Sequence, residues 1–344
     1  MKQAWKWLTA LLTTISLLLS AAGQPGDAGA LGARCAQTGL VKSERALRKE
    51  RGRSLCASAS PAAALLSDAA ADAPTPEPVT TVMESDAALS RETTIPGGIS
   101  VKNATSYPVD AEAILSAGCS LRLSAEGPQI LILHTHGSEA YTPAGLDRYE
   151  SDDAYRTEDE RCNVVRVGDE LQRVFEEAGL RVLHDRSLYD SPSYAGSYSR
   201  SGEAVERYLA EYPGISVVID LHRDALGSGD VVYKTMAEEA GTVASQVMLL
   251  VGTDESGLPH PNWNRNLSLA LYLQAAAVRA HPTLMRPVSL VPQRYNQQLC
   301  PGSLLLEVGS SGNTLQEALA AARLFGAAAA EALLALAEEP PEGT

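Results

Sequence analysis

Short apolar runs alternate with amphipathic helical patterns across residues 127–337, and this alternation leaves few folds open to the chain. Strands are predicted at residues 129–134, 180–184, 215–221, 247–252 and 303–308, and helices at residues 158–178, 199–212, 264–280 and 315–337. Strands that alternate with helices in this way favour parallel pairing, because a parallel crossover needs a long connection. We therefore predict an α/β fold with a mostly parallel central sheet and helices on both faces.

Two histidines and a carboxylate follow the first apolar run. Residues 130–133 are Ile-Leu-Ile-Leu, and the chain continues with His134, His136 and Glu139. A catalytic zinc ion takes three nitrogen, sulfur or oxygen ligands from the protein and leaves a fourth position for water. The His-x-x-Glu spacing can supply two such ligands, His136 and Glu139, on one side of a tight turn in which Gly137 permits backbone angles that a larger residue resists. The alternative is a loop histidine with a capping glutamate. His134 falls on the same strand face as His136, and its role stays open between ligand, support for a ligand and substrate contact.

Another histidine ends a second apolar run, at residues 217–222. Alternation along this strand places Asp220, His222 and Asp224 on one face. We predict His222 as a metal ligand, with Asp220 or Asp224 as the carboxylate that orients it. The competing interpretation is a buried histidine that bonds Asp220 for structural reasons alone.

Glu307 stands in the aliphatic run Ser-Leu-Leu-Leu-Glu-Val. Burial raises the pKa of a carboxyl group toward the range of a usable general base, so Glu307 is the predicted base. The alternative is a glutamate bonded to the backbone of Ser310 or Ser311. Arg223 or Arg200 is the predicted partner for negative charge on the reacting carbonyl.

Parallel sheets collect ligands beyond the carboxyl ends of their strands. His184 ends the second predicted strand and therefore joins the same group of candidates. Tyr189, Tyr194 and Tyr198 follow in a turn-rich segment, which is either a loop that contacts substrate or a surface turn without a function.

The N-terminal region predicts export and a tether. Residues 1–22 carry two lysines ahead of an apolar stretch that ends in small residues, the order of an export signal. Because the stretch approaches the roughly 20 residues that span a bilayer, both cleavage and retention as a membrane anchor stay open. Residues 23–98 are rich in Ala, Ser, Pro and acidic residues and predict a disordered tether. Residues 99–126 are then a lead-in, residues 127–337 the main domain and residues 338–344 a tail.

The charge of the chain argues against nucleic acid as a partner. With 28 Lys and Arg against 42 Asp and Glu, the formal net charge is −14. Phosphate groups repel such a protein, since nucleic-acid affinity comes largely from basic side chains on the backbone.

Several motifs in fixed order resemble the stage II sporulation protein P family across residues 127–337. They are His134-Thr-His136-Gly-Ser-Glu139-Ala-Tyr141, Arg156-Thr-Glu-Asp159, Asn163-Val-Val-Arg-Val-Gly168, His184-Asp185, Asp190-Ser-Pro-Ser-Tyr194, Ile219-Asp-Leu-His222-Arg-Asp-Ala225 and Leu306-Glu307-Val-Gly309. The resemblance implies an exported or membrane-anchored peptidoglycan hydrolase of endospore formers that acts during engulfment. It implies N-acetylmuramoyl-L-alanine amidase and endopeptidase activities, with stage II sporulation proteins D and M as partners.

More distantly, the domain is similar to zinc-dependent N-acetylmuramoyl-L-alanine amidases and, in ligand order, to zinc carboxypeptidases. This similarity implies a Zn²⁺ cofactor held by His136, Glu139 and His222, with Glu307 as the base. The muramoyl amidases take their glutamate ligand from near the start of the first helix, where this chain has Asp159, so Asp159 competes with Glu139.

The remaining candidates are predicted to bind substrate or to support the ligands: His134, Asp159, His184, Asp220 and Arg200. Two other functions stay open. One is a zinc carboxypeptidase-like amide hydrolase with another substrate, and the other is a non-catalytic wall-binding module.

Overall fold

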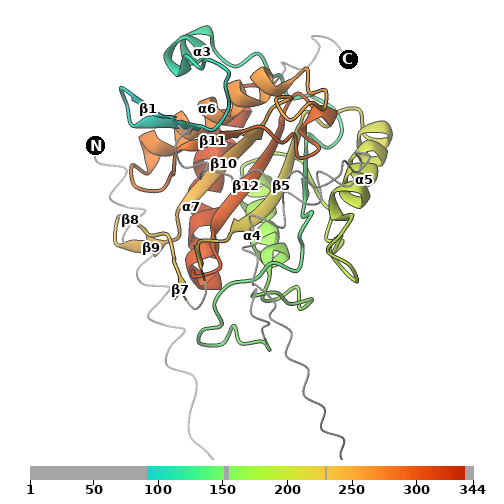
Figure 1. The fold of residues 1–344 in the computed structure, drawn as a ribbon, viewed down its shortest axis with the longest axis vertical. Coiled ribbons are helices and arrows are strands. Elements are labelled where there is room, and N and C mark those ends of the chain that lie inside the picture. Colours follow the sequence, from blue (N-terminus) through green and yellow to red (C-terminus); the bar gives the residue numbers. More distant parts are fainter. Residues whose placement is uncertain (1–90, 151–154, 229–230, 338–344) are drawn as a thin grey trace, which may run out of the picture. The chain divides into compact units, whose positions relative to one another are not determined.

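The computed structural model describes residues 91–150, 155–228 and 231–337 (Figure 1). The predicted export segment, most of the predicted tether and the tail lie outside these residues. Within the described part of the chain, no helix combines the length and the apolar character needed to cross a membrane.

An eight-stranded sheet forms the centre of the described region, in the order β1-β2-β11-β10-β12-β5-β3-β4 (Figure 1). Its strands are β1 Arg91–Ile95, β2 Ile99–Asn103, β3 Ile130–Leu133, β4 Val182–His184, β5 Val217–Asp224, β10 Val247–Gly252, β11 Val288–Val291 and β12 Ser303–Ser310. Among the described residues, two pairs of adjacent strands in this sheet are antiparallel, β1 with β2 and β10 with β12. The other adjacent pairs are parallel. The predicted mostly parallel sheet is confirmed.

Helices cover both faces of the sheet. They are α3 Ala111–Ala117, α4 Val164–Glu177, α5 Ser197–Glu211, α6 Trp263–Ala280 and α7 Leu315–Leu334. Alternate residues of β3 face opposite cores: Ile130 and Ile132 pack in the large core with α4, α6 and α7, whereas Leu131 and Leu133 pack in a smaller core with Val205 of α5. Figure 1 shows α4 and α7 behind the sheet and α5 apart from them, beside β5. The α/β class predicted from the sequence is thereby confirmed.

Two small hairpins follow β5. They are formed by β6 Gly227–Ser228 with β7 Val231–Val232, and by β8 Ala237–Glu239 with β9 Thr242–Ala244. The exposed side chains of Val231, Tyr233, Met236 and Val243 belong to this region.

The N-terminal boundary corrects one expectation. We predicted a disordered tether up to residue 98, but residues 91–95 form β1, which pairs with β2 inside the predicted lead-in. Gly97 and Gly98 make the tight turn between them, with φ of 93° and 79° that favour glycine. The domain therefore begins no later than Arg91. β1 lies at one edge of the sheet.

One predicted helix starts later than expected. The helix predicted from residue 158 begins at Val164, because the Asn163 side chain accepts a hydrogen bond from the Val165 backbone N–H and caps it. The residues before it form a turn in which Asp159 binds Arg161.

Candidate active site

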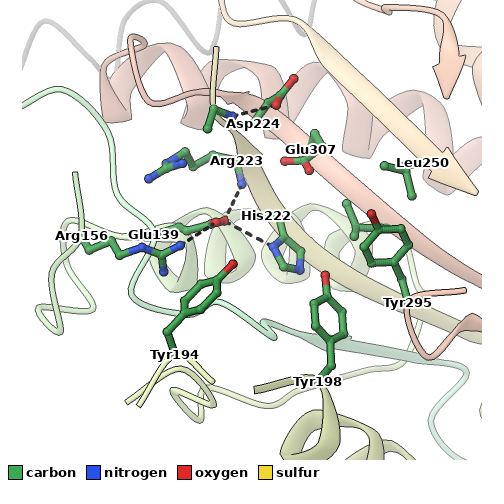
Figure 2. A pocket seen from close by; sticks show the side chains of 12 residues that line it. Glu139, Arg156, Tyr194, Tyr198, His222, Arg223, Asp224, Leu250, Tyr295 and Glu307 are labelled. Carbon is green, nitrogen blue, oxygen red and sulfur yellow. Dashed lines mark hydrogen bonds and ion pairs between the residues drawn. The ribbon is translucent and has the colours of Figure 1, made fainter. Parts of the chain in front are cut away.

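The mutually parallel strands β3, β5 and β12 bring their carboxyl ends to one edge of the sheet. Glu307 of β12 and His222 of β5 are register partners there. A small cavity of about 50 Å³ opens beside them. Its lining consists of Glu139, Arg156, Tyr194, Tyr198, His222, Arg223, Asp224, Ala225, Leu250, Tyr295, Leu305 and Glu307 (Figure 2).

The three predicted ligands are neighbours in the structure, although their side chains are not arranged as a metal site. Glu139 Oε2 lies 3.3 Å from His222 Nδ1, and the rings of His136 and His222 meet edge to face with centroids 5.3 Å apart. The turn between His136 and Glu139 is closed by a backbone hydrogen bond of 3.0 Å from Glu139 N to His136 O. Gly137 serves close packing here rather than an unusual backbone angle, since a Cβ on it would meet Leu188 at 2.6 Å.

His136 is fully buried under two tyrosine rings. Tyr194 stacks on it at 4.4 Å and Tyr198 meets it edge-on at 5.4 Å. Burial lowers the pKa of His136 to about 3, so the ring is neutral at physiological pH. Both ring nitrogens are buried without a hydrogen-bond partner among the described residues.

The two glutamates of the pocket have opposite electrostatic environments. Burial, reinforced by nearby Asp224, raises the pKa of Glu307 to about 8. Burial also opposes ionisation of Glu139, but the positive charges of Arg223 and His222 outweigh it and hold the pKa of Glu139 below its usual range. Glu139 is therefore ionised, and Glu307 is poised to exchange a proton near neutral pH.

Asp220 fixes the far side of the His222 ring. Its Oδ1 lies 2.8 Å from His222 Nε2, and its two oxygens accept bonds of 2.8 and 2.7 Å from the Thr135 backbone N–H and hydroxyl. Despite the cost of burial, Asp220 and Glu139 raise the pKa of His222 well above its usual value. Asp224, the other candidate for this role, instead pairs with Arg286 at 2.7 Å.

His134 and His184 lie outside the lining of the pocket. Their Nε2 atoms are 2.8 Å apart, and His134 Nδ1 lies 2.8 Å from the Leu221 carbonyl oxygen, one residue before His222. Asp169 approaches His184 Nδ1 at 3.3 Å. Gly168 of α4 lies against the pair, because a Cβ there would meet the two Nε2 atoms at 2.6 and 2.8 Å. The pair therefore contacts β5 through the Leu221 carbonyl.

Three predictions need correction. Asp159 is not beside the pocket: it forms a surface ion pair with Arg161 at 2.6 Å, which leaves Glu139 as the carboxylate beside His222. The guanidinium of Arg223 donates to the carbonyls of Ala140 (2.9 Å) and Tyr155 (3.3 Å). The guanidinium of Arg200 donates to the carbonyls of Tyr189, Ser193 and Ala195. Arg200 lies outside the lining of the cavity, whereas Arg223 lines it while its guanidinium bonds the carbonyls of Ala140 and Tyr155.

Sequence reasoning missed Tyr295 and the role of Arg156. Tyr295 arrives from the turn after β11, where Tyr295 and Asn296 both have positive φ, of 48° and 58°. Two such residues in succession are costly without glycine and mark a segment held in place by its surroundings. Arg156 pairs with Asp190 at 2.7 Å and with Glu139 at 3.3 Å, and so ties the loop that carries Tyr194 to the ligand turn.

Among the residues that the structure describes, no three His, Cys, Asp or Glu side chains are grouped so as to hold a metal ion. The donors nevertheless fit zinc in kind. His136, His222 and Glu139 offer imidazole nitrogen and carboxylate oxygen, and the buried nitrogens of His136 find no partner elsewhere in the described chain.

This α/β domain thus carries a pocket at the carboxyl edge of its sheet, lined by His222 and by acidic, arginine and tyrosine side chains. A sequence model of the Stage II sporulation protein P (SpoIIP) family matches residues 66–330, and the chain belongs to that family. Stage II sporulation protein P of Bacillus subtilis (strain 168) is 28% identical over 199 residues, which are 55% of this chain and 47% of that protein. The chain therefore matches about half the length of this relative.

Two solved structures illustrate what the chain is similar to. N-acetylmuramoyl-L-alanine amidase AmiC2 of Nostoc punctiforme is 12% identical, with a TM-score of 0.36, over 61% of this chain and 98% of that chain. The CwlD amidase from Clostridioides difficile, solved in complex with the GerS lipoprotein, is 15% identical, with a TM-score of 0.37, over 60% of this chain and 98% of that chain.

Proposed function

We propose that this protein is a zinc-dependent peptidoglycan hydrolase that cleaves the amide between the lactyl group of N-acetylmuramic acid and L-alanine. The observation that carries the proposal is the pairing of Glu307 with His222 on neighbouring parallel strands, with Glu139 and His136 beside them. An ionised carboxylate, two imidazoles and a carboxyl group that titrates near neutral pH are the parts that hydrolysis of an amide requires.

Each residue has a definite task in this proposal. His136, Glu139 and His222 would hold the zinc ion. The ion, when bound, supplies a water of lowered pKa and polarises the scissile carbonyl. Glu307 takes a proton from the attacking water and returns it to the leaving amine. Asp220 keeps the His222 ring in its orientation through the contact of 2.8 Å.

We further propose that the domain works outside the cytoplasm. The support is the sequence of residues 1–22, which has the order of an export signal or anchor. Action during sporulation, endopeptidase activity and the partnership with stage II sporulation proteins D and M are part of the same proposal, and membership of the family supports them.

The proposal is tested by mass analysis of purified peptidoglycan after digestion with the zinc-loaded full chain. We expect free stem peptides that begin with L-alanine. Glu307→Gln should abolish their release, whereas Glu206→Gln, on the exposed side of α5, should not. Intact sugar–peptide linkages after digestion, or full activity after stringent chelation, would refute the proposed bond or the proposed cofactor respectively.

A further inference from the structure

Hydrolysis of an amide places negative charge on the carbonyl oxygen, and a hydrogen-bond donor aimed at that oxygen accelerates the reaction. The two arginines expected in this role donate to backbone carbonyls instead. A lining side chain with a donor that no described group engages is therefore a better candidate.

Tyr198 has the properties of that donor. Its hydroxyl oxygen is buried and has no hydrogen-bond partner among the described residues, although Tyr198 lines the cavity with His222 and Glu307. Figure 2 shows the hydroxyl groups of Tyr198 and Tyr295 pointing toward the side of the pocket that carries His222 and Glu307. A buried hydroxyl left unpaired costs about 1–3 kcal/mol, so its retention inside the pocket points to a partner that arrives with the substrate.

Contacts around Tyr198 hold it in place. Its ring lies edge-on to His136 at 5.4 Å and 5.6 Å from the ring of Tyr295. Its carbonyl accepts a bond of 2.7 Å from the side-chain amide of Asn296, one of the two residues with positive φ. Gly202 makes room for this contact, because a Cβ on it would come within 3.1 Å of the Asn296 amide.

We propose that Tyr198 is a catalytic residue whose O–H donates a hydrogen bond to the scissile carbonyl oxygen as that oxygen becomes negative; this inference rests on the proposed amidase function. The water oxygen bonds to the carbonyl carbon, the π electron pair moves to the carbonyl oxygen, and the proton of the water passes to Glu307. The Tyr198 proton stays on its own oxygen throughout. When the carbonyl re-forms, the C–N bond breaks and the amine takes the proton from Glu307.

The test is Tyr198→Phe, which keeps the ring against His136 and removes only the hydroxyl. In the zinc-loaded full chain we expect kcat for a soluble muramoyl peptide to fall about 10²–10³-fold, as for other single oxyanion donors. KM should change less than about twofold, because the bond forms only in the transition state. Tyr208→Phe is the matched control: it lies on the same helix outside the lining of the cavity and should keep wild-type kcat.

A second measurement does not depend on turnover. A phosphinate analogue of the scissile amide carries an oxygen like the developing oxyanion, so Tyr198→Phe should weaken its binding by about the same factor as kcat/KM. Wild-type kcat in Tyr198→Phe, with an active wild-type enzyme, would overturn the role of Tyr198 and leave the proposed function standing. A wild-type enzyme that releases no stem peptides would overturn both.

Discussion

The ring of Tyr194 lies almost flat on the ring of His136, with centroids 4.4 Å apart and planes 10° from parallel. The guanidinium of Arg156 also lies over Tyr194, 4.9 Å from its centroid. The cavity of about 50 Å³ lies beside this stack, and Tyr194 and Arg156 both line it. Tyr194 therefore covers one face of the His136 ring.

Removal of that cover should change the titration of His136. In the zinc-free protein, burial holds the pKa of His136 at about 3. Tyr194→Ala should raise it toward 6.5, because water reaching the ring stabilises its charged form. NMR titration of the imidazole measures the shift, and Tyr208→Ala should leave it unchanged. A His136 that still titrates near 3 would show that Tyr194 does not shield it.

A methyl group at position 168 should destabilise the domain. Gly168→Ala places a Cβ within 2.6 and 2.8 Å of the His184 and His134 Nε2 atoms, and overpacking of this kind costs about 1–3 kcal/mol. Denaturant unfolding measures the loss. The double variant Gly168→Ala/His184→Ala should lose less free energy of unfolding than the two single variants lose in sum, because the smaller side chain at position 184 leaves room for the methyl group. Simple additivity would contradict the close contact.

In the zinc-free protein, Glu307 should lower the free energy of unfolding as the pH rises. Its folded pKa of about 8 lies above the ordinary value of 4.5, so the folded state keeps a proton that the unfolded state releases. The contribution of Glu307 to the free energy of unfolding is therefore greatest below pH 4.5, and it is lost as the pH rises toward 8. Glu307→Gln should therefore raise the melting temperature at pH 8 but not at pH 4, while it removes activity. Equal effects at both pH values would contradict the raised pKa.

Arg200 should restrict the motion of the loop at residues 189–195, which carries Tyr194. Its guanidinium bonds the carbonyls of Tyr189, Ser193 and Ala195, and a bond from a charged donor contributes about 1.5–3 kcal/mol. Arg200→Gln should increase amide hydrogen exchange in residues 189–195 by at least about tenfold. Arg207→Gln, an exposed change on the same helix, is the control. Unaltered exchange would mean that other contacts hold the loop.

The sequence predicted the central strands well, because their apolar runs are long and end in polar residues. It missed β11, whose four residues lie between Pro287 and Pro292 and carry little periodic signal. It also missed β1, whose side chains are mostly exposed, and β2, which pairs with it in the predicted lead-in, although Pro-Gly-Gly at residues 96–98 was a turn signal. Short strands are defined by their neighbours more than by their own composition.

The candidate site was predictable where it follows the strand ends, at His136, Glu139, His222 and Glu307. The directions in which the long side chains point were not predictable from the sequence. Arg223 and Arg200 turn away to satisfy backbone carbonyls, and Tyr295 arrives from a strained turn far along the chain. Such choices depend on tertiary contacts that no local pattern encodes.

The edge position of β1 fixes how far the first described residues lie from the site. Five steps across the sheet separate β1 from β5, and at about 4.8 Å per step they amount to roughly 24 Å. Arg91, the first described residue, therefore lies at the margin of the sheet, whereas His222 and Glu307 lie near its middle.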